Sequence, residues 1–253
     1  MPVTKAVVII PTYNEKENVA RIIDAVFNLN RGYHVLIIDD NSPDGTAQIV
    51  KEKQPESEGK LHIVERKGKL GLGTAYIKGF EWSLEREYDY VFEMDADFSH
   101  NPADLPRLLE ACENGADLAV GSRYVSGVNV VNWPMGRVLM SYFASKYVRV
   151  VTGLKIADTT AGFKCYSRKV LEAINFDQIR FKGYAFQIEM KFTAWQLGFK
   201  VVEVPIVFTD RTEGTSKMSG GIFNEAVWGV LSMKMRSIFE STKKKHHKVE
   251  NAK

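Results

Sequence analysis

The sequence predicts an α/β fold built on a mostly parallel central sheet with helices on both faces. Short apolar segments alternate with segments in which apolar residues recur at a helical period, which is typical of strand-helix-strand units. The apolar segments are continuous rather than alternating, as expected of parallel strands buried on both faces. At 253 residues, 45% of them hydrophobic, the chain is long enough to bury such a core.

The first half of the chain contains four predicted strands, each followed by a predicted helix. The strands lie at 6–10, 33–38, 61–65 and 90–94, and the helices at 18–29, 46–53, 74–87 and 104–113. Right-handed crossovers then make the strands parallel. Gly71 and Gly73 precede or open the third helix, and we interpret them as turn and helix-entry residues because neither GxGxxG nor GxxxxGK[ST] is present.

The second half continues the pattern less regularly. We expect a strand at 117–124, helices at 137–151, 181–197 and 221–240, a short strand after a loop that begins at 158, and a strand at 200–208. Pro205 favours an edge position for that last strand, because proline donates no ladder hydrogen bond. We expect residues 1–240 to form one domain and residues 241–253 to form a basic, disordered tail.

Charge and cysteine content limit the partners and the compartment. The net charge is +3, but five Lys and one Glu give residues 242–253 a charge of +4, so the remaining body carries −1. We therefore expect no nucleic-acid partner. Cys112 and Cys165 lack CxxC spacing and are expected to be free thiols in a reducing, cytoplasmic compartment. No signal region or membrane-spanning stretch is predicted.

Asp95 and Asp97 follow the strand at 90–94 and are the first candidates for chemistry. Ligands of open α/β sheets bind at the carboxyl ends of the strands, and an Asp-X-Asp pair there offers oxygen ligands to a divalent cation that carries a diphosphate. The alternative is that both residues only close the strand and cap the next helix.

Cationic residues in the second half are candidates for binding phosphate. Arg123 ends the strand at 117–124, where its planar fork suits a phosphate, although a surface arginine has the same pattern. Arg137 and Ser141 lie one turn apart on a predicted helix, so either they hold one anion together or the helix is simply an amphipathic surface helix.

Two further segments allow both a functional and a neutral interpretation. Arg211 and Lys217 lie in a polar loop at 210–217 that either closes over a diphosphate or only connects two elements. The helix at 221–240 has a wide apolar surface next to the lysine-rich tail, which suits binding to an anionic membrane surface. A solvated tail is the alternative.

Six motifs occur in order along most of the chain. They are Pro11-Thr-Tyr-Asn-Glu15, Asp39-Asp-Asn-Ser-Pro-Asp-Gly45, Gly71-Leu-Gly-Thr-Ala75, Met94-Asp-Ala-Asp-Phe-Ser-His100, Gly121-Ser-Arg-Tyr124 and Arg211-Thr-Glu-Gly-Thr-Ser-Lys217. Together they resemble the inverting GT-A glycosyltransferases of family two, and within that family the polyprenol (dolichyl) phosphate mannose synthases. The resemblance implies a glycosyltransferase that moves mannose from GDP-mannose to a polyprenyl monophosphate with Mg²⁺ or Mn²⁺.

The resemblance also implies roles for individual residues. The guanosine would be held by Pro11, Tyr13, Glu15, Ile38 and Asp40. The ribose and diphosphate would lie against Asp95, Ala96 and Asp97, with Asp97 and Ser99 as metal ligands. Diphosphate charge would be neutralised by Arg211 and Lys217, and the acceptor phosphate would be gripped by Arg123, Arg137 and Ser141. Asp95, Asp97, Arg123 and Arg211 would be the catalytic residues.

A phosphate acceptor removes the need for a general base, since it is already anionic near neutral pH. Glu189 lies where relatives with hydroxyl acceptors place a base, and we therefore expect it to be structural. The chain resembles the short type of the family, without transmembrane segments. It would meet the lipid peripherally at the cytoplasmic face of a membrane, through surface helices, through the basic tail or through a separate membrane subunit.

Three alternatives remain at this stage. The family motifs also suit a polyprenyl-phosphate glycosyltransferase that uses UDP-glucose or another activated sugar. A sugar-phosphate nucleotidyltransferase is disfavoured because Pro11-Thr-Tyr-Asn-Glu15 is unlike its glycine-rich loop. A non-catalytic sugar-nucleotide-binding subunit is disfavoured because the carboxylates and arginines of the motifs are all present.

Overall fold

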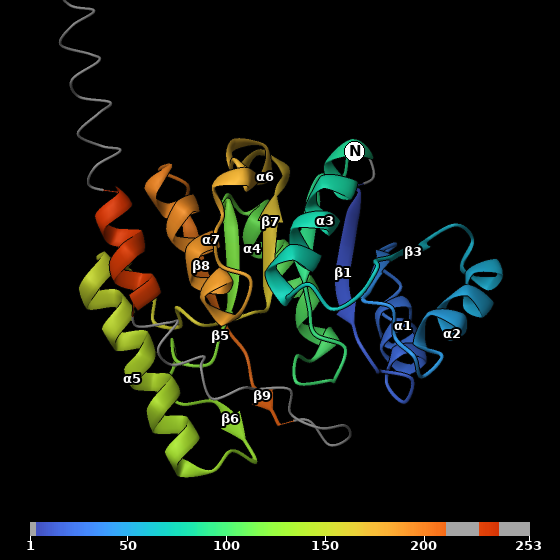
Figure 1. Cartoon of the computed structure of the whole chain (residues 1–253), viewed down its shortest axis with the longest axis horizontal. Coiled ribbons are helices and arrows are strands. Elements are labelled where there is room, and N and C mark those ends of the chain that lie inside the picture. The colour runs from blue at the N-terminus through green and yellow to red at the C-terminus, as the bar shows by residue number, and fades with distance from the viewer. Residues whose placement is uncertain (1–3, 211–227, 238–253) are drawn as a thin grey trace, which may run out of the picture.

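The computed structural model describes residues 4–210 and 228–237. Its main feature is a seven-stranded sheet with the strand order β3-β2-β1-β4-β7-β5-β8 (Figure 1). In chain order, the strands of this sheet are β1 (Ala6–Thr12), β2 (His34–Asp39), β3 (Leu61–Glu65), β4 (Tyr90–Glu93), β5 (Leu118–Ser122), β7 (Lys164–Ser167) and β8 (Val201–Pro205). Two short strands, β6 (Val130–Val131) and β9 (Phe208–Thr209), pair with each other separately.

The helices follow the predicted order, with four short additions. The α-helices are α1 (Val19–Phe27), α2 (Thr46–Lys53), α3 (Leu72–Glu85), α4 (Leu105–Glu113), α5 (Met135–Thr152), α6 (Arg168–Ala173) and α7 (Tyr184–Gln196), and residues 228–237 are also helical. Three 3-10 helices are η1 (Gln54–Ser57), η2 (Pro102–Asp104) and η3 (Phe176–Gln178). The bounds of α2 and β3 agree with the prediction, whereas α6, β6 and the 3-10 helices were not predicted. The single strand predicted at 200–208 is wrong, because the chain leaves the large sheet after Pro205 and residues from Phe208 pair with β6 as β9.

The sheet is mostly parallel, as predicted. β1 lies between β2 and β4 and is parallel to both, and β5 is parallel to β8. The exception is β7, which is antiparallel to β4 on one side and to β5 on the other. β8 is the last strand at one edge, which confirms the edge position expected from Pro205.

Helices cover both faces of the sheet, and the alternation along β1 shows how. Val8 and Ile10 belong to a cluster with side chains of α1, α2 and α4, whereas Val7 and Ile9 belong to a second cluster with side chains of α3, α6 and α7. Successive side chains of a strand point to opposite faces. A continuous apolar strand therefore supplies both cores, which confirms the helices predicted on both faces.

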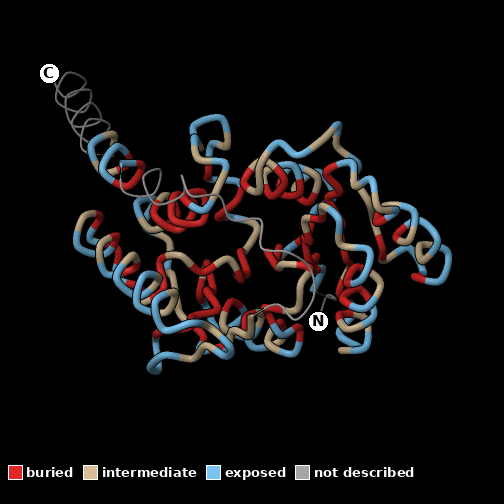
Figure 2. Tube along the Cα trace, turned by 60° about the horizontal axis from the view of Figure 1, so that its bottom comes forward, coloured by how far each residue is buried: buried red, intermediate tan, exposed pale blue. Residues whose placement is uncertain are grey.

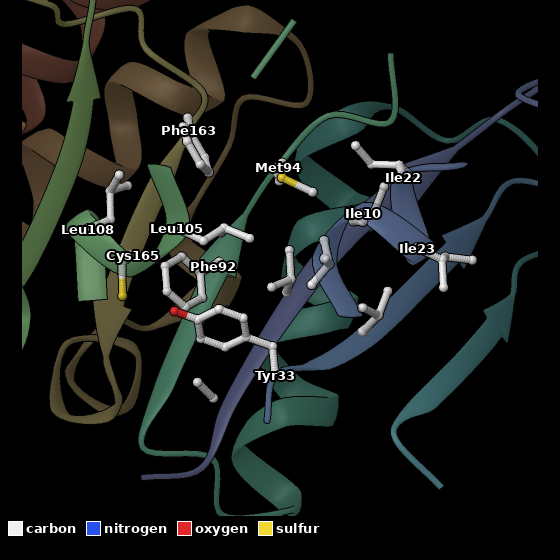
Figure 3. Packing of buried hydrophobic residues seen from close by; sticks show 14 of the residues in the cluster. Ile10, Ile22, Ile23, Tyr33, Phe92, Met94, Leu105, Leu108, Phe163 and Cys165 are labelled. Carbon is white, nitrogen blue, oxygen red and sulfur yellow. The ribbon is translucent and has the colours of Figure 1, made fainter. Parts of the chain in front are cut away.

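The first cluster is closely packed around the centre of the sheet. Figure 3 shows Ile10 from β1 beside Ile22 and Ile23 from α1, with Phe92 of β4 next to Tyr33. Figure 2 shows the same distribution at the scale of the chain, with burial concentrated in the strands and on the inward sides of the helices. Such packing stabilises the fold by roughly 1.5–3 kcal/mol for each large side chain removed from water.

A third cluster joins α5, α7 and the helix at 228–237. Val148, Ile188, Phe192, Val230 and Met233 form it, and Figure 1 shows α5 beside the C-terminal helical segment. The rest of the predicted helix at 221–240, residues 211–217 of the predicted loop and the predicted tail at 241–253 lie outside the described residues. Within the described ranges, no helix combines the length and the hydrophobicity needed to cross a membrane.

Candidate active site

The loops after β1 and β2 are joined into one surface at the carboxyl edge of the sheet. The backbone N–H of Asn14 donates to Ser42 Oγ at 3.0 Å, and that of Glu15 donates to Thr46 Oγ1 at 3.0 Å. Asn14 and Asn41 have φ of 56° and 58°, a conformation that asparagine tolerates better than most residues. The sequence therefore builds two tight turns in which side chains after β2 accept hydrogen bonds from backbone N–H groups after β1.

The two adjacent carboxylates at the carboxyl end of β2 have different surroundings. Asp39 is fully buried and accepts hydrogen bonds from Thr12 Oγ1 at 2.8 Å and from the Ser42 hydroxyl at 2.6 Å. Asp40 instead pairs with Arg66, whose Nε lies 2.6 Å from Asp40 Oδ1. Asp39 thus holds the turn, while Asp40 remains the candidate for binding a nucleoside.

Arg66 was missed by the sequence analysis. It follows β3 directly, at the same edge of the sheet, and its Nη1 also donates to Thr74 Oγ1 at 2.7 Å, which connects Asp40 to the start of α3. Burial raises the pKa of Asp40, while Arg66 opposes that shift by stabilising the carboxylate. Arg123 was selected because it ends a strand. Arg66 also follows a strand directly, so the same argument could have identified it from the sequence.

The other residues predicted to hold guanosine lie near this pair but differ in exposure. Tyr13 is partly exposed, and the Lys69 ammonium lies 5.2 Å from the centre of its ring. The Glu15 carboxylate accepts a hydrogen bond from Asn18 Nδ2 at 3.1 Å. Pro11 is half-buried in β1, and Ile38 is completely buried in the second core cluster.

Asp95, Ala96 and Asp97 follow β4 in a tight turn. Tyr76 Oη lies 3.4 Å from Asp95 Oδ1, and the backbone N–H of Ser99 donates to Asp97 Oδ1 at 3.1 Å. Ala96 is buried, whereas both carboxylates are partly exposed. The two acidic side chains are therefore presented at the surface of this edge by a turn that their own hydrogen bonds stabilise.

The residues present fit a divalent cation of the kind that binds with a diphosphate. Among the described residues, no group of three His, Cys, Asp or Glu side chains forms a complete metal cage. Mg²⁺ and Mn²⁺ prefer oxygen ligands, and Mg²⁺ commonly binds to one or two carboxylates together with substrate phosphates. Asp97 supplies such a carboxylate, and the Ser99 hydroxyl beside it is buried without a hydrogen-bond partner in the described chain.

A buried polar network lies beneath this turn and was not predicted. Glu93, the last residue of β4, accepts hydrogen bonds from Tyr166 Oη and Gln187 Nε2, both at 2.8 Å, and pairs with Lys164 Nζ at 3.0 Å. Glu93 and Lys164 are opposite each other in the β4–β7 ladder. A charged residue that interrupts an apolar strand was the signal, but its partner comes from far along the chain.

His100 and Phe208 connect the carboxylate turn to Arg123. The His100 ring stacks on Phe163 at 4.9 Å and meets the edge of Phe208 at 5.4 Å. The Arg123 guanidinium lies 5.5 Å from the centre of the same Phe208 ring. Burial lowers the pKa of His100 to about 4, so the imidazole is neutral near neutral pH.

Arg123 is held in a buried ion pair. Its Nε and Nη2 donate to the two oxygens of Asp158 at 2.7 and 2.6 Å, and Nη2 also donates to Thr160 Oγ1 at 2.7 Å. Burial works against both charges, yet the pairing raises the pKa of Arg123 and lowers the pKa of Asp158. These bonds fix the orientation of the guanidinium, and Nη1 takes no part in them.

The structure brings Arg137 and Ser141 to the same place as Arg123. The Arg137 guanidinium lies 4.2 Å from the centre of the Trp133 ring, and the Arg123 guanidinium lies 5.4 Å from that ring. Ser141 lies close enough to the Tyr124 hydroxyl to affect its pKa. The three residues expected to bind one phosphate therefore converge around Tyr124 and Trp133, although Arg137 is also paired with Asp210 at 2.9 Å.

Glu189 has the contacts of a structural residue. One carboxylate oxygen accepts the backbone N–H groups of Arg180 and Phe181 at 2.9 and 3.0 Å, and the other accepts from Arg236 Nη2 at 2.8 Å. The side chain thereby links α7 to the helix at 228–237. Arg211 and Lys217, predicted to neutralise the diphosphate, lie outside the described residues.

A mostly parallel sheet with paired carboxylates after its central strand defines the GT-A architecture of nucleotide-sugar transferases. A family model described as glycosyl transferase family 2 matches residues 7–174. The chain belongs to glycosyl transferase family 2 and is a glycosyltransferase.

Curated relatives match almost the whole chain. A polyprenol monophosphomannose synthase from Mycolicibacterium smegmatis is 47% identical over 93% of this chain and 89% of its own length. An undecaprenyl-phosphate mannosyltransferase from Micrococcus luteus is 46% identical over 90% of this chain and 95% of its own length. A dolichol-phosphate mannosyltransferase from Pyrococcus furiosus is 38% identical over 85% of this chain, but over 60% of its own length.

Solved structures share the fold at much lower identity. A glucosyl-3-phosphoglycerate synthase from Mycobacterium tuberculosis, solved with Mn²⁺, UDP and phosphoglyceric acid, has a TM-score of 0.64 at 16% identity and covers 92% of this chain and 78% of its own. A mannosyltransferase from Pyrobaculum calidifontis, solved with GDP-Man and Mn²⁺, has a TM-score of 0.58 at 16% identity over 93% of this chain and 64% of its own. These similarities confirm the GT-A fold predicted from the sequence.

Proposed function

We propose that the chain transfers mannose from GDP-mannose to the phosphate of a polyprenyl monophosphate, with inversion and with Mg²⁺ or Mn²⁺. The relatives from Mycolicibacterium smegmatis and Micrococcus luteus are named for mannose transfer to polyprenyl phosphates, and each matches at least 90% of this chain. The structure solved with GDP-Man and Mn²⁺ has the same fold, which supports the proposed donor and cofactor.

One observation carries the proposal. Two arginines and a serine converge at the position proposed for the acceptor phosphate, and Phe208 contacts both Arg123 and His100, which follows the carboxylate turn. An acceptor anion and a donor diphosphate would therefore lie next to each other. This proximity is what transfer to a phosphate requires, since catalysis rests on holding the attacking oxygen in line with the leaving group.

The chemistry needs few groups from the protein. A phosphate monoester attacks the anomeric carbon as an anion, so no residue has to remove a proton. Two acidic side chains of the second half of the chain are engaged by protein groups: Asp158 binds Arg123, and Glu189 binds two backbone amides and Arg236. Arg123 and Arg137 would orient the acceptor, and Asp40 with Arg66 would hold the nucleoside end of the donor.

Asp97 and Ser99 would hold the cation. When bound, a divalent ion supplies positive charge that stabilises the diphosphate as it leaves. Arg211 and Lys217, which follow β9 in the sequence, are proposed to contribute to the same stabilisation, as the family motif implies.

The lipid chain of the acceptor would contact the exposed surfaces of α5 and the helix at 228–237. Met135, Val150 and Trp228 expose 70%, 78% and 71% of their surfaces, and further apolar side chains on the same two helices are exposed at Leu139, Met140, Phe143, Leu231 and Met235. Arg137 and Ser141 lie on α5 itself, so the phosphate would reach its site while its chain rests on this surface. We therefore propose peripheral binding to the cytoplasmic face of a membrane.

The test is a transfer assay with purified protein, a short polyprenyl phosphate, Mn²⁺ and ¹⁴C-labelled GDP-mannose, with labelled UDP-glucose in parallel. Label from GDP-mannose in the organic phase supports the proposal. Label from UDP-glucose alone overturns the donor and retains the acceptor. Label from neither donor overturns the proposal that this chain transfers the sugar by itself and favours a non-catalytic role.

A further inference from the structure

Two buried hydrogen-bond donors at the phosphate position have no partner. Tyr124 Oη and Trp133 Nε1 are both inaccessible to solvent and make no hydrogen bond within the described part of the chain. Tyr124 is 8% exposed. An unsatisfied buried donor costs roughly 1–3 kcal/mol, so two of them at one place indicate groups kept for a ligand rather than for stability.

The surroundings of these donors point to an anion. The Arg123 guanidinium lies 5.2 Å from the centre of the Tyr124 ring and 5.4 Å from that of Trp133. Arg137 lies 4.2 Å from the Trp133 ring, and Ser141 lies close enough to Tyr124 Oη to oppose the rise in the Tyr124 pKa, without making a well-formed hydrogen bond to it. Both orphan donors therefore lie among the three residues that the proposed function assigns to the acceptor phosphate.

Charge balance explains why further donors are needed. Asp158 already neutralises Arg123, and Asp210 pairs with Arg137 at 2.9 and 3.0 Å. An arriving phosphate thus meets two guanidiniums whose charges are largely compensated. Neutral O–H and N–H donors bring no carboxylate with them, so they add hydrogen bonds to the phosphate without an opposing charge.

The chemistry of the two side chains suits this role. Burial raises the pKa of Tyr124 from its ordinary value of 10.0, although Ser141 and Arg123 oppose the shift, so the hydroxyl keeps its proton at neutral pH. The indole N–H of Trp133 donates only. Both rings are also held in place, Tyr124 against Tyr142 at 5.7 Å and Trp133 against Phe208 at 5.2 Å.

We propose that Tyr124 Oη and Trp133 Nε1 donate hydrogen bonds to the acceptor phosphate and complete the site formed by Arg123, Arg137 and Ser141. The inference rests on the proposed acceptor class. It assigns to these two aromatic residues the binding of the phosphate, not of the sugar nucleotide.

Tyr124→Phe and Trp133→Phe test the proposal, because each removes the donor and keeps an aromatic ring. Calorimetric titration with farnesyl phosphate, a soluble acceptor analogue, is expected to show a Kd raised about tenfold for each variant. The Kd for GDP-mannose is expected to stay unchanged. Thermal unfolding of the free Tyr124→Phe protein is expected at the wild-type temperature or above it, since an unpaired buried hydroxyl has been removed.

Tyr33→Phe is the matched control. Its hydroxyl is also buried without a partner in the described chain, but Tyr33 precedes β2 at the opposite end of the sheet. This variant is expected to bind farnesyl phosphate like the wild type. Wild-type affinity in both Tyr124→Phe and Trp133→Phe, or an equal loss of GDP-mannose affinity, overturns the proposal.

The binding assay separates this inference from the proposed function. If the wild type binds farnesyl phosphate more tightly than farnesol but transfers no mannose, the transfer function is wrong. The affinities of the two variants for farnesyl phosphate then decide whether the proposed phosphate site is correct. If the wild type does not distinguish farnesyl phosphate from farnesol, there is no phosphate site and the inference is wrong.

Discussion

Asp158 holds Arg123 by three hydrogen bonds, two from the guanidinium at 2.7 and 2.6 Å and one from the Arg123 backbone N–H at 3.0 Å. The Asp158 backbone N–H is in turn bound by Glu203 at 2.9 Å. The loop that carries Asp158 is thereby tied to the edge strand β8. The orientation of Arg123 depends on a residue 35 positions away.

Asp158→Asn is expected to destabilise the protein by about 3–5 kcal/mol, because it leaves the Arg123 charge buried and uncompensated. The amide oxygen still accepts from Arg123, but the amide NH₂ that replaces the second oxygen is a donor and cannot accept, so the change removes both the charge and part of the hydrogen bonding. Urea unfolding measures the effect. The double variant Arg123→Met with Asp158→Asn is expected to recover part of the stability while transfer activity stays low, and a double variant less stable than the single one contradicts this account.

Asp97→Ala is expected to lower kcat by about a hundredfold or more, because the cation and the leaving diphosphate lose their carboxylate. Its stability is expected to stay near that of the wild type, since Asp97 is partly exposed. Chelation with EDTA is expected to abolish transfer by the wild type, and Mn²⁺ or Mg²⁺ to restore it. Asp177→Asn, at an exposed position in η3, is the control for removing an acidic charge.

Glu189→Gln distinguishes a structural carboxylate from a general base. Loss of a base typically costs about 10²–10⁴-fold in rate. We expect instead a loss of stability of about 1–3 kcal/mol, because Glu189 binds two backbone amides and Arg236. The shape of the pH–rate profile is expected to stay the same, and the disappearance of an acidic limb in the variant would assign Glu189 a proton-transfer role.

Local patterns predicted the elements well, whereas contacts between distant segments were missed. The bounds of α2 and β3 follow from apolar periodicity and turn residues, which act over a few neighbours. The antiparallel insertion of β7 between β4 and β5 depends on pairing across some 70 residues, for which a single sequence has no signal.

The same distinction applies to the candidate site. Asp95, Asp97 and Arg123 were found because they end strands, and Arg137 and Ser141 because they lie one helical turn apart. Trp133 neither ends a predicted strand nor lies one helical turn from another candidate residue. Its contacts with Arg123 and Phe208 join segments that are separated in the sequence, so no local pattern identifies it.

Gly73→Ala is expected to destabilise the protein by about 1–3 kcal/mol. An added Cβ would lie 2.7 Å from two atoms of the Phe186 ring and 2.9 Å from the Phe181 carbonyl oxygen. Gly136→Ala is the matched control, because a Cβ there meets nothing within 4 Å and the residue is inside α5. It is expected to stabilise by about 0.4–1 kcal/mol, and equal effects of the two changes on thermal unfolding would contradict the packing argument.

His34 and His62 form a partly buried pair at the amino end of the sheet. Their Nδ1 and Nε2 atoms are 3.3 Å apart, and Tyr88 Oη lies 2.9 Å from His34 Nδ1. Burial lowers the pKa of both imidazoles from their ordinary value of 6.5, and Lys5 lowers that of His34 further. Both rings are therefore neutral in the folded protein at pH values where the unfolded chain is already protonated.

Just below pH 6.5 the unfolded state thus binds more protons than the folded state. The free energy of unfolding therefore falls as the pH falls below 6.5, whereas above pH 6.5 this histidine pair does not affect it. We expect the free energy of unfolding in urea to be lower at about pH 5.5 than at about pH 7.5. His62→Gln keeps a hydrogen-bonding amide beside His34 and removes one titrating group, so it is expected to reduce this difference. A variant whose unfolding free energy changes with pH as steeply as that of the wild type would show that the pair does not control acid stability, and the buried His100 would then be the group to test.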